Sequence, residues 1–236
     1  MALPFYSIVI PFHNEEDSLR ELIPRLTTQT LAIGRPHEIL FVDDGSTDKG
    51  QEIIKEHAQN NENIKLLSSD SQLGQTESFR IAFQNVQGQF TIRMDADLQD
   101  SPEDLPLFLE KIDQGAELVM GLRECRRHSR ILRVASGVYD LLVVLLLNSP
   151  FHSSAGSFVA FKTELIRDIP MRKHDHRFFP IIALERGAKN EGEIFVQHNA
   201  RRYGQSKYNV FRKLLFGIPQ VLIFLFRLKT GAFKKS

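Results

Sequence analysis

The sequence has little of several features that mark particular classes of protein. Its one cysteine, Cys125, leaves no internal disulfide possible, which fits a reducing compartment. The apolar stretches 141–147 and 214–226 are too short to cross a bilayer, because the longer one extends roughly 20 Å as a helix against about 30 Å of hydrocarbon. Residues 1–10 lack the basic start of a signal peptide and are interpreted as a strand.

Acidic residues are absent from 201–236, where nine Lys or Arg residues stand among apolar ones. The rest of the chain has 21 basic and 29 acidic residues, so an acidic body precedes a basic, apolar tail. Such a tail suits an anionic surface, although a solvated basic terminus is the alternative. We predict a domain at 1–212 and an interfacial, non-spanning tail at 213–236.

Three phosphate- or ion-binding motifs are also missing. No G-x-G-x-x-G follows the first expected strand, and the P-loop spacing of Gly45 and Gly50 is not continued by Lys and Ser/Thr. A calcium EF-hand starting at Asp95 is excluded because Asp100 stands where that loop needs glycine. A nucleotide would therefore have to bind by other means.

Strands and helices alternate through the first half of the chain. The apolar patterns predict strands at 5–11, 38–42, 64–67, 90–94 and 118–120 and helices at 15–27, 49–58 and 75–86, with another helix capped by Ser101. Repeated strand–helix units favour a parallel sheet covered on both faces. Further on we expect helices at 134–147, 164–168, 178–185 and 208–227, the last disturbed at Gly217 and Pro219, and strands at 157–161 and 193–198.

Polar clusters follow three of the expected strands, at 11–15, 43–48 and 95–100. One such cluster is equally well explained by turn and capping chemistry. In a parallel sheet, however, ligands bind at the carboxyl ends of the strands, so three clusters at one edge predict a shared site.

The third cluster, Asp95-Ala96-Asp97-Leu98-Gln99, offers oxygen ligands for a hard cation such as Mg²⁺ or Mn²⁺. A cation held by carboxylates with open positions usually bridges to phosphate oxygens. The acids of the second cluster better suit base N–H groups or ribose hydroxyls. Basic residues outside the clusters would complete a phosphate cradle, and the candidates are Arg123, Arg133, Arg202 and Lys207.

These motifs together resemble the inverting family-two glycosyltransferases, in particular the dolichol-phosphate mannose synthase-like, or polyprenyl-phosphate glycosyltransferase, branch. The residues that carry the resemblance are 8–16, 41–48, 94–103, 121–123, 133–136, 176–180 and 201–208. The Asp-Ala-Asp-Leu-Gln run with a downstream Arg-x-x-Gly-x-Ser-Lys element is a specific pairing, whereas each half alone is weaker.

The resemblance implies an α/β fold of the GT-A type, Rossmann-like with a mostly parallel central sheet, to which the tail adds a C-terminal interfacial helix. It implies a divalent metal held by Asp97 and Gln99, with Asp95 nearby. The implied catalytic residues are Asp95, Asp97, Arg123 and Arg133. The implied nucleotide-sugar-binding residues are Pro11, His13, Glu15, Asp43, Asp44, Asp95, Ala96, Asp97, Arg123, Arg202 and Lys207.

Three positions depart from the pattern of that branch. His13 stands where tyrosine is usual, Leu122 replaces a small polar residue, and Ser154 stands where an aspartate usually precedes the glycine by two residues. The paired transmembrane helices of many bacterial relatives are absent from the sequence.

The sequence thus predicts an enzyme that moves a sugar from a UDP- or GDP-sugar to a polyprenyl phosphate, peripherally, at the cytoplasmic face of a membrane. Its partners would be the donor, the lipid acceptor, the membrane surface and a membrane protein or second copy, and not nucleic acid. The alternatives are a glycosyltransferase with a soluble or polysaccharide acceptor and a non-catalytic nucleotide-sugar-binding subunit.

Overall fold

A central sheet of seven strands organises the molecule, described here from a computed structural model for residues 3–123, 141, 143–152, 157–199, 202–203 and 210–234. The strands are β1 (Tyr6–Phe12), β2 (His37–Asp43), β3 (Ile64–Ser68), β4 (Phe90–Arg93), β5 (Leu118–Arg123), β6 (Val159–Lys162) and β7 (Glu191–Val196). Their order is β3-β2-β1-β4-β6-β5-β7. Only β6 runs antiparallel to its neighbours, so this sheet is mostly parallel, as predicted.

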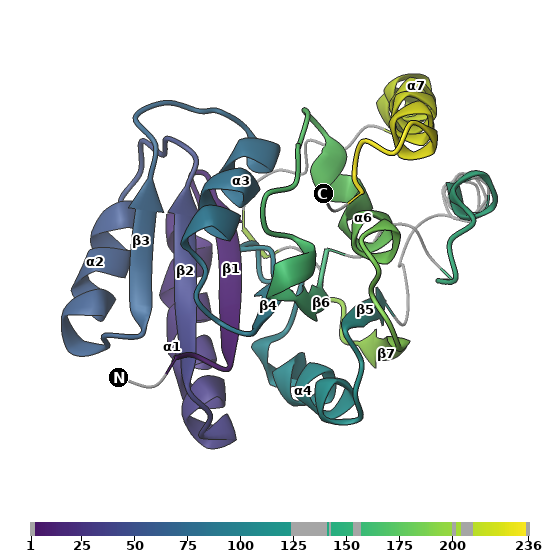
Figure 1. Ribbon diagram of the computed structural model, residues 1–236. Helices are drawn as coiled ribbons and strands as arrows, with labels where there is room; N and C mark the ends of the chain where they lie inside the picture. The colour runs from purple at the N-terminus through teal and green to yellow at the C-terminus, as the bar shows by residue number, and fades with distance from the viewer. Residues whose placement is uncertain are drawn as a thin grey trace.

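Helices cover both faces of the sheet (Figure 1). The described α-helices are α1 (Glu16–Ile33), α2 (Gly50–Asn60), α3 (Gln75–Asn85), α4 (Leu105–Asp113), α6 (Phe179–Glu185) and α7 (Val210–Lys229). Short 3₁₀ turns are η1 (Pro102–Asp104), η2 (Thr163–Leu165) and η3 (Asp175–Phe178). A helical segment at 143–147 packs with α6 and α7 in the core on their side of the sheet.

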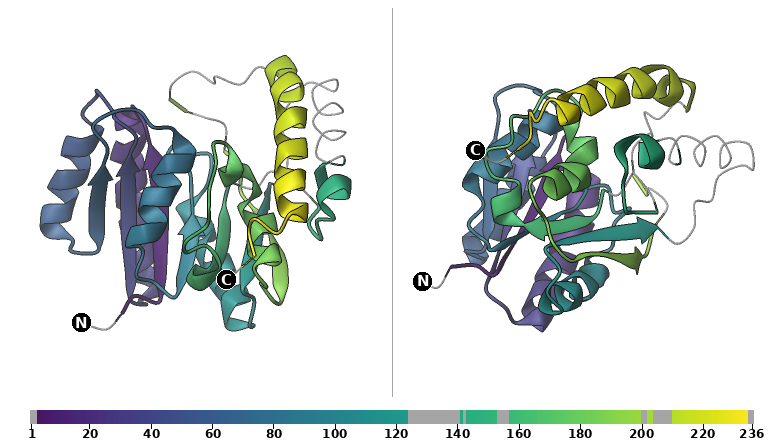
Figure 2. Two further views of the ribbon diagram at one scale, coloured as in Figure 1. Left: turned by 45° about the horizontal axis from the view of Figure 1, so that its top comes forward. Right: turned by 45° about the vertical axis from the view of Figure 1, so that its right-hand side comes forward.

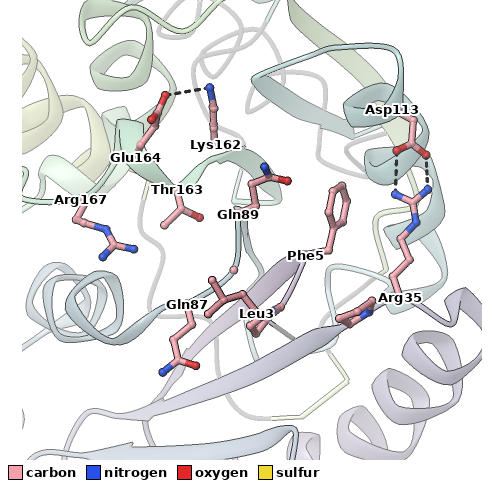
Figure 3. Close-up of a pocket in the computed structure, with 13 residues that line it drawn as sticks. Leu3, Phe5, Arg35, Gln87, Gln89, Asp113, Lys162, Thr163, Glu164 and Arg167 are labelled. Carbon is pink, nitrogen blue, oxygen red and sulfur yellow. Dashed lines mark hydrogen bonds and ion pairs between the residues drawn. The ribbon is translucent and has the colours of Figure 1, made fainter. Parts of the chain in front are cut away.

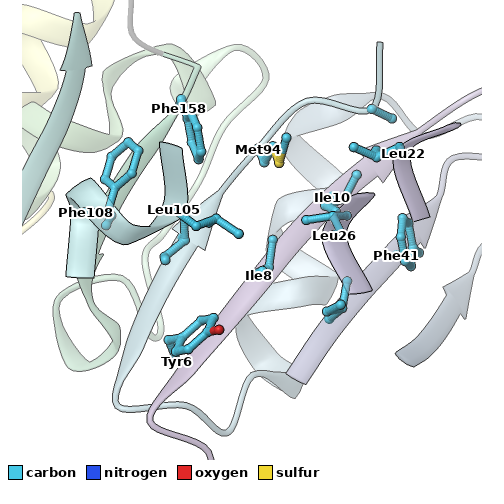
Figure 4. Packing of buried hydrophobic residues seen from close by; sticks show 14 of the residues in the cluster. Tyr6, Ile8, Ile10, Leu22, Leu26, Phe41, Met94, Leu105, Phe108 and Phe158 are labelled. Atoms are coloured by element: carbon cyan, nitrogen blue, oxygen red, sulfur yellow. The ribbon is translucent and has the colours of Figure 1, made fainter. Parts of the chain in front are cut away.

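Alternating side chains of the central strands pack into two separate hydrophobic cores, one on each face of the sheet. Ile8 and Ile10 of β1 point toward α1, α2 and α4, where they pack with Leu22 and Leu26 (Figure 4). Val9, between them, faces the opposite core, which α3, α6 and α7 cover. Because a strand presents successive side chains to opposite faces, a strand that is buried along its whole length, as β1 is, needs a layer on each side. The core therefore lies in two slabs, and the strand ends remain available for a site.

Several local expectations differ from the structure. Helix α1 continues past residue 27 to Gly34, whose φ of 68° ends it in the left-handed conformation that suits glycine. The helix expected at 164–168 is instead the turn η2. Ser101 does not cap through its side chain: its backbone oxygen accepts the Asp104 amide at 3.0 Å, and its hydroxyl accepts Asn199 at 2.8 Å. Most of the helix expected at 134–147 lies outside the described residues.

The C-terminal helix α7 runs without a break through Gly217 and Pro219, although the sequence predicted a disturbance there. Its C-terminal half is held by packing, since Phe224 stacks on Phe178 with ring centroids 4.2 Å apart and also contacts Phe233. The boundary predicted between 212 and 213 falls inside this helix. Among the described residues, no helix combines the length and apolarity that crossing a membrane requires.

Candidate functional site

The three polar clusters meet at the carboxyl edge of the sheet, because β2, β1 and β4 are adjacent and parallel. The Asp44 amide donates to the oxygen of Phe12 at 2.9 Å, and the Met94 amide donates to the oxygen of Val9 at 3.1 Å. The pairing that forms the sheet therefore continues into the loops that carry the clusters. The sequence-based prediction of three clusters at one edge is confirmed.

The first and second clusters interlock. The Nδ1 atom of His13 lies 2.8 Å from the backbone oxygen of Asp44. Asn14 has a φ of 54°; its backbone amide donates to Ser46 Oγ at 2.9 Å, and its side-chain Oδ1 accepts the Thr47 amide at 2.8 Å. The two loops are thus joined by hydrogen bonds along one side of the candidate site.

The carboxylates of the second cluster are engaged by the protein itself. Asp43 accepts the Ser46 amide at 3.0 Å and the Gln51 side chain at 2.6 Å, and it is almost fully buried. Asp44 accepts the amides of the two residues that precede α3, at 2.7 and 2.8 Å. In this structure both acids shape the loops; their contact with a nucleotide stays a prediction.

The acidic loop, residues 95–100, places its side chains alternately in and out of the protein. Asp95, Asp97 and Gln99 are partly exposed, whereas Ala96, Leu98 and Asp100 are buried. Leu98 adopts a φ of 61°, unusual for a residue with a side chain, and the Gln99 amide then donates to Asp97 Oδ1 at 3.2 Å. The turn keeps the two predicted metal ligands beside each other.

Asp100 is the buried centre of this loop and is not among the site residues predicted from the sequence. Its Oδ2 accepts the Asp95 amide and the Ser157 hydroxyl, each at 3.2 Å, and Arg123 Nη2 lies 3.8 Å from its Oδ1. Burial and then the Asp95 carboxylate raise the pKa of Asp100 to about 7, against the opposing charge of Arg123. The loop therefore concentrates more negative charge than Arg123 neutralises.

Arg123 is the one member of the predicted phosphate cradle that the described residues place at the acidic loop; its Nη2 also donates to Ser157 Oγ at 2.5 Å. Arg202 instead binds both carboxylate oxygens of Glu21 on α1, at 2.8 and 3.0 Å. Arg133, Lys207 and Ser154 lie outside the described residues. Of the remaining predicted residues, Pro11 is buried within β1, and Glu15, which follows β1, accepts Ser18 Oγ at 2.9 Å.

The acidic loop fits a hard divalent cation by its chemistry. Asp97 and Gln99 supply carboxylate and amide oxygens. The charge of Asp95, which after burial is the next cause of the raised pKa of Asp100, adds a further carboxylate to the same loop. Three His, Cys, Asp or Glu side chains arranged as a complete metal cage do not occur among the described residues. An open site with few protein ligands is the arrangement in which a cation also binds phosphate oxygens.

A cavity lies away from these residues, at the amino-terminal edge of the sheet (Figure 3). It measures about 970 Å³ and is lined by residues such as Phe5, Gln89 and Thr163. Four of its charged side chains form ion pairs, Arg35 with Asp113 at 2.7 Å and Lys162 with Glu164 at 3.0 Å, and Arg167 donates to the backbone oxygen of Val86 at 3.3 Å. The carboxyl edge, with its converging acids, is the better candidate site.

The comparison that decides the family covers most of the domain. The profile of "Glycosyl transferase family 2" matches residues 7–169, which include all three clusters. The chain belongs to glycosyl transferase family 2. Two similar curated relatives in this family are undecaprenyl-phosphate 4-deoxy-4-formamido-L-arabinose transferases. The one from Edwardsiella ictaluri is 32% identical over 212 residues, covering 89% of this chain and 65% of the relative. The one from Salmonella typhimurium is 33% identical over 207 residues, covering 87% and 63%.

The chain therefore spans a little under two thirds of the length of these relatives. Solved structures agree on the fold of this family 2 chain. Glucosyl-3-phosphoglycerate synthase from Mycobacterium tuberculosis, in complex with Mn²⁺, UDP-glucose and phosphoglyceric acid, superposes with a TM-score of 0.67 at 17% identity, covering 99% of this chain and 81% of that one. Its complex with phosphoglyceric acid alone gives a TM-score of 0.68. The predicted GT-A fold and family are confirmed.

We expect the stability of this family 2 domain to depend on pH through His176, a buried histidine behind the acidic loop. Burial, followed by the charges of Arg93, Arg177 and His174, lowers the pKa of His176 to about 2. Thr76 Oγ accepts the His174 amide at 2.9 Å, so its hydroxyl proton is available to donate to His176 Nδ1, 2.7 Å away. A neutral ring is thus built into the folded state.

Between pH 6.5 and 2 the unfolded chain binds a proton at His176 that the folded chain does not, so stability falls as the pH drops below 6.5. We expect His176→Gln to flatten the pH dependence of the unfolding free energy by roughly 1 kcal/mol between pH 7 and pH 5.5. Urea denaturation at both pH values measures this. Thr76→Val, which keeps the histidine, should lower stability at both pH values and keep the steep slope; equal slopes for all three proteins would contradict the assignment.

Proposed function

We propose that this chain transfers a sugar from a nucleoside-diphosphate sugar, a UDP- or GDP-sugar, to a polyprenyl phosphate, with inversion at the anomeric carbon. The observation that carries the proposal is the acidic loop at the carboxyl edge of the sheet, flanked by Arg123. The naming of the relatives as undecaprenyl-phosphate transferases supports the choice of acceptor. The Mn²⁺ and UDP-glucose in the similarly folded synthase support a metal-dependent nucleotide-sugar donor.

In the proposed reaction, Asp97 and Gln99 would hold Mg²⁺ or Mn²⁺, which neutralises charge on the departing diphosphate when bound. A phosphate oxygen of the lipid forms the new bond to the anomeric carbon while the bond from that carbon to the diphosphate breaks. A phosphate monoester has a second pKa near about 6, so it is largely dianionic at neutral pH and attacks without a general base. The protein would orient the two substrates and shield their phosphates from mutual repulsion, a role that we assign to Arg123 beside the acidic loop.

The place of action in this proposal is the cytoplasmic face of a membrane, reached by peripheral binding. Helix α7 lies along the outside of the domain (Figure 2). It turns Val221 and Phe224 into the core and exposes Ile218, Leu222 and Phe226. Lys229 and Lys234 follow at its end, so apolar and basic groups occur together as they do in interfacial helices.

The test is transfer of radiolabelled sugars from a panel of UDP- and GDP-sugars to undecaprenyl phosphate, dolichyl phosphate and a short soluble prenyl phosphate. We expect transfer to the lipid phosphates with at least one donor, loss of transfer in EDTA, and recovery with Mn²⁺ or Mg²⁺. If sugar is transferred only to hydroxyl groups of soluble or polysaccharide acceptors, the proposal of a polyprenyl phosphate acceptor is wrong. Donor binding without transfer to any acceptor would make the chain a binding subunit.

A further inference from the structure

A buried arginine lies directly behind the first aspartate of the acidic loop. Arg93 is the last residue of β4, two positions before Asp95, and is only 5% exposed. Its guanidinium lies 4.6 Å from the centroid of the Phe79 ring and 5.8 Å from that of Phe179. Burying a charged group costs free energy unless the group is well paired. The partners of Arg93 therefore indicate the role of this buried arginine.

Arg93 reaches two partners at once. Its Nη1 donates to the backbone oxygen of His176 at 2.7 Å, and its Nη2 lies 3.7 Å from Asp95 Oδ1. The first contact fixes the guanidinium plane against the segment before α6. The second contact then holds a positive charge in a fixed position next to Asp95. Arginine can make both contacts because the donors of its planar guanidinium point in different directions.

A second donor meets the same oxygen of Asp95. Gln75, the first residue of α3, brings its Nε2 to 3.3 Å from Asp95 Oδ1. The amides just before Gln75 are in turn bound by Asp44 of the second cluster. Two elements from different parts of the chain therefore restrain one carboxylate oxygen. Such restraint matters here because Asp95 also adjoins the buried Asp100 carboxylate, whose repulsion would otherwise turn the side chain away.

We propose that Arg93 is a positioning residue that fixes Asp95 in the orientation required for binding the divalent cation and the donor. The inference rests on the proposed function for its ligand. Asp95 is not one of the two proposed ligands, but it belongs to the same acidic loop as Asp97 and Gln99, so turning its carboxylate away would remove negative charge from the cation site. Replacing a residue that supports the ligands of a metal site typically lowers metal affinity about 10- to 100-fold. Arg93→Lys keeps the positive charge but replaces the two separate nitrogens of a rigid plane by a single ammonium, so it tests the effect of orientation apart from that of charge.

Arg227 provides a matched control in the same region. It is 6% exposed, pairs with Asp175, donates to the oxygen of Pro170 at 2.6 Å and lies 4.6 Å from the centroid of Phe233. It thus holds the same segment, from the α7 side, by the same kinds of contact as Arg93. The interactions described for Arg227 do not include Asp95. If Arg93 serves only packing, lysine at either position should have the same consequences.

The experiment titrates the full chain with Mn²⁺ alone, followed by electron paramagnetic resonance of the free ion, and measures kcat and KM with the best donor and undecaprenyl phosphate. We expect Arg93→Lys to weaken Mn²⁺ binding by about tenfold or more and to lower kcat. Arg227→Lys should lose comparable stability in urea and keep its Mn²⁺ affinity within about twofold. Gln75→Leu, at a partly exposed position, should weaken Mn²⁺ binding in the same direction without loss of stability and covers the case in which Arg93→Lys does not fold.

Two results would overturn the inference. One is an unchanged Mn²⁺ affinity in both Arg93→Lys and Gln75→Leu. The other is an equal loss in Arg93→Lys and Arg227→Lys with none in Gln75→Leu, which would make Arg93 a packing residue. Wild-type protein that binds no Mn²⁺ and transfers sugar in EDTA would instead overturn the metal in the proposed function, and the inference with it.

Discussion

Asp97→Ala should reduce sugar transfer by about 1,000-fold or more, the largest effect we expect from any single substitution in the acidic loop. The side chain is partly exposed at the carboxyl edge, so its removal opens no cavity in either core. Its oxygen is one of two proposed protein ligands, and a cation that stabilises charge on a leaving diphosphate contributes several kcal/mol to the transition state. Each 1.4 kcal/mol corresponds to a factor of ten in rate.

The measurement compares initial rates of transfer to undecaprenyl phosphate, with and without EDTA, for wild type, Asp97→Ala and Asp70→Ala. Asp70 is an exposed aspartate in the loop after β3 and serves as a control for the loss of one negative charge. Its variant should keep wild-type rates and wild-type sensitivity to EDTA. A folded Asp97→Ala protein with near-normal turnover that EDTA does not affect would remove the metal from the proposed site.

The strands around the site were predictable because their sequences carry a physical signal on both faces. The apolar runs of β1 and β2 are buried throughout, and polar residues begin where each strand ends. That pattern locates the clusters at one edge once the sheet is taken as parallel. The antiparallel direction of β6 could not be predicted in this way, because the apolar sequence of a short buried strand is the same whether it runs parallel or antiparallel to its neighbours.

The partners of single side chains were not predictable in the same way. Arg93 is an isolated cation at the end of an apolar strand, and its hydrogen-bond partner His176 is 83 residues away in sequence. Arg202 was expected at the phosphates, yet it binds Glu21, which is 181 residues away. Contacts at such separations depend on how the layers pack, and local patterns carry no information about them. The environment of Asp100 is of the same kind, since its partners are Arg123, at the end of β5, and Ser157, just before β6.

The tail illustrates how tertiary packing overrides a local rule. Proline inside a helix removes one hydrogen bond and usually bends or ends it. Helix α7 nevertheless continues beyond Pro219, with Val221 and Phe224 packed into the core and Arg227 paired with Asp175. Deleting the tail would therefore remove core residues together with the exposed ones. Its proposed role at a membrane is better tested by changing the exposed face alone.

Replacing Leu222, Ile223 and Phe226 together by serine should weaken binding to vesicles by roughly 100-fold. These side chains are 52%, 58% and 69% exposed on α7. Burying the exposed part of each contributes about 1 kcal/mol, so the three together contribute about 3 kcal/mol, and each 1.4 kcal/mol is a factor of ten in affinity. Stability in urea should change little, because the face buried against the domain keeps Phe224 and Arg227.

Flotation with vesicles of anionic and neutral phospholipid measures the binding, and turnover is compared on undecaprenyl phosphate in vesicles and on a short soluble prenyl phosphate. The triple variant should lose turnover on the vesicle-bound acceptor and keep it on the soluble one, since the acidic loop is untouched. Leu31→Ser, which removes an equally exposed leucine from α1 (71% exposed), should behave as wild type in both assays. Equal loss on the two acceptors would mean that this face of α7 supports the fold or the site, and unchanged flotation would mean that the membrane binds elsewhere on the chain.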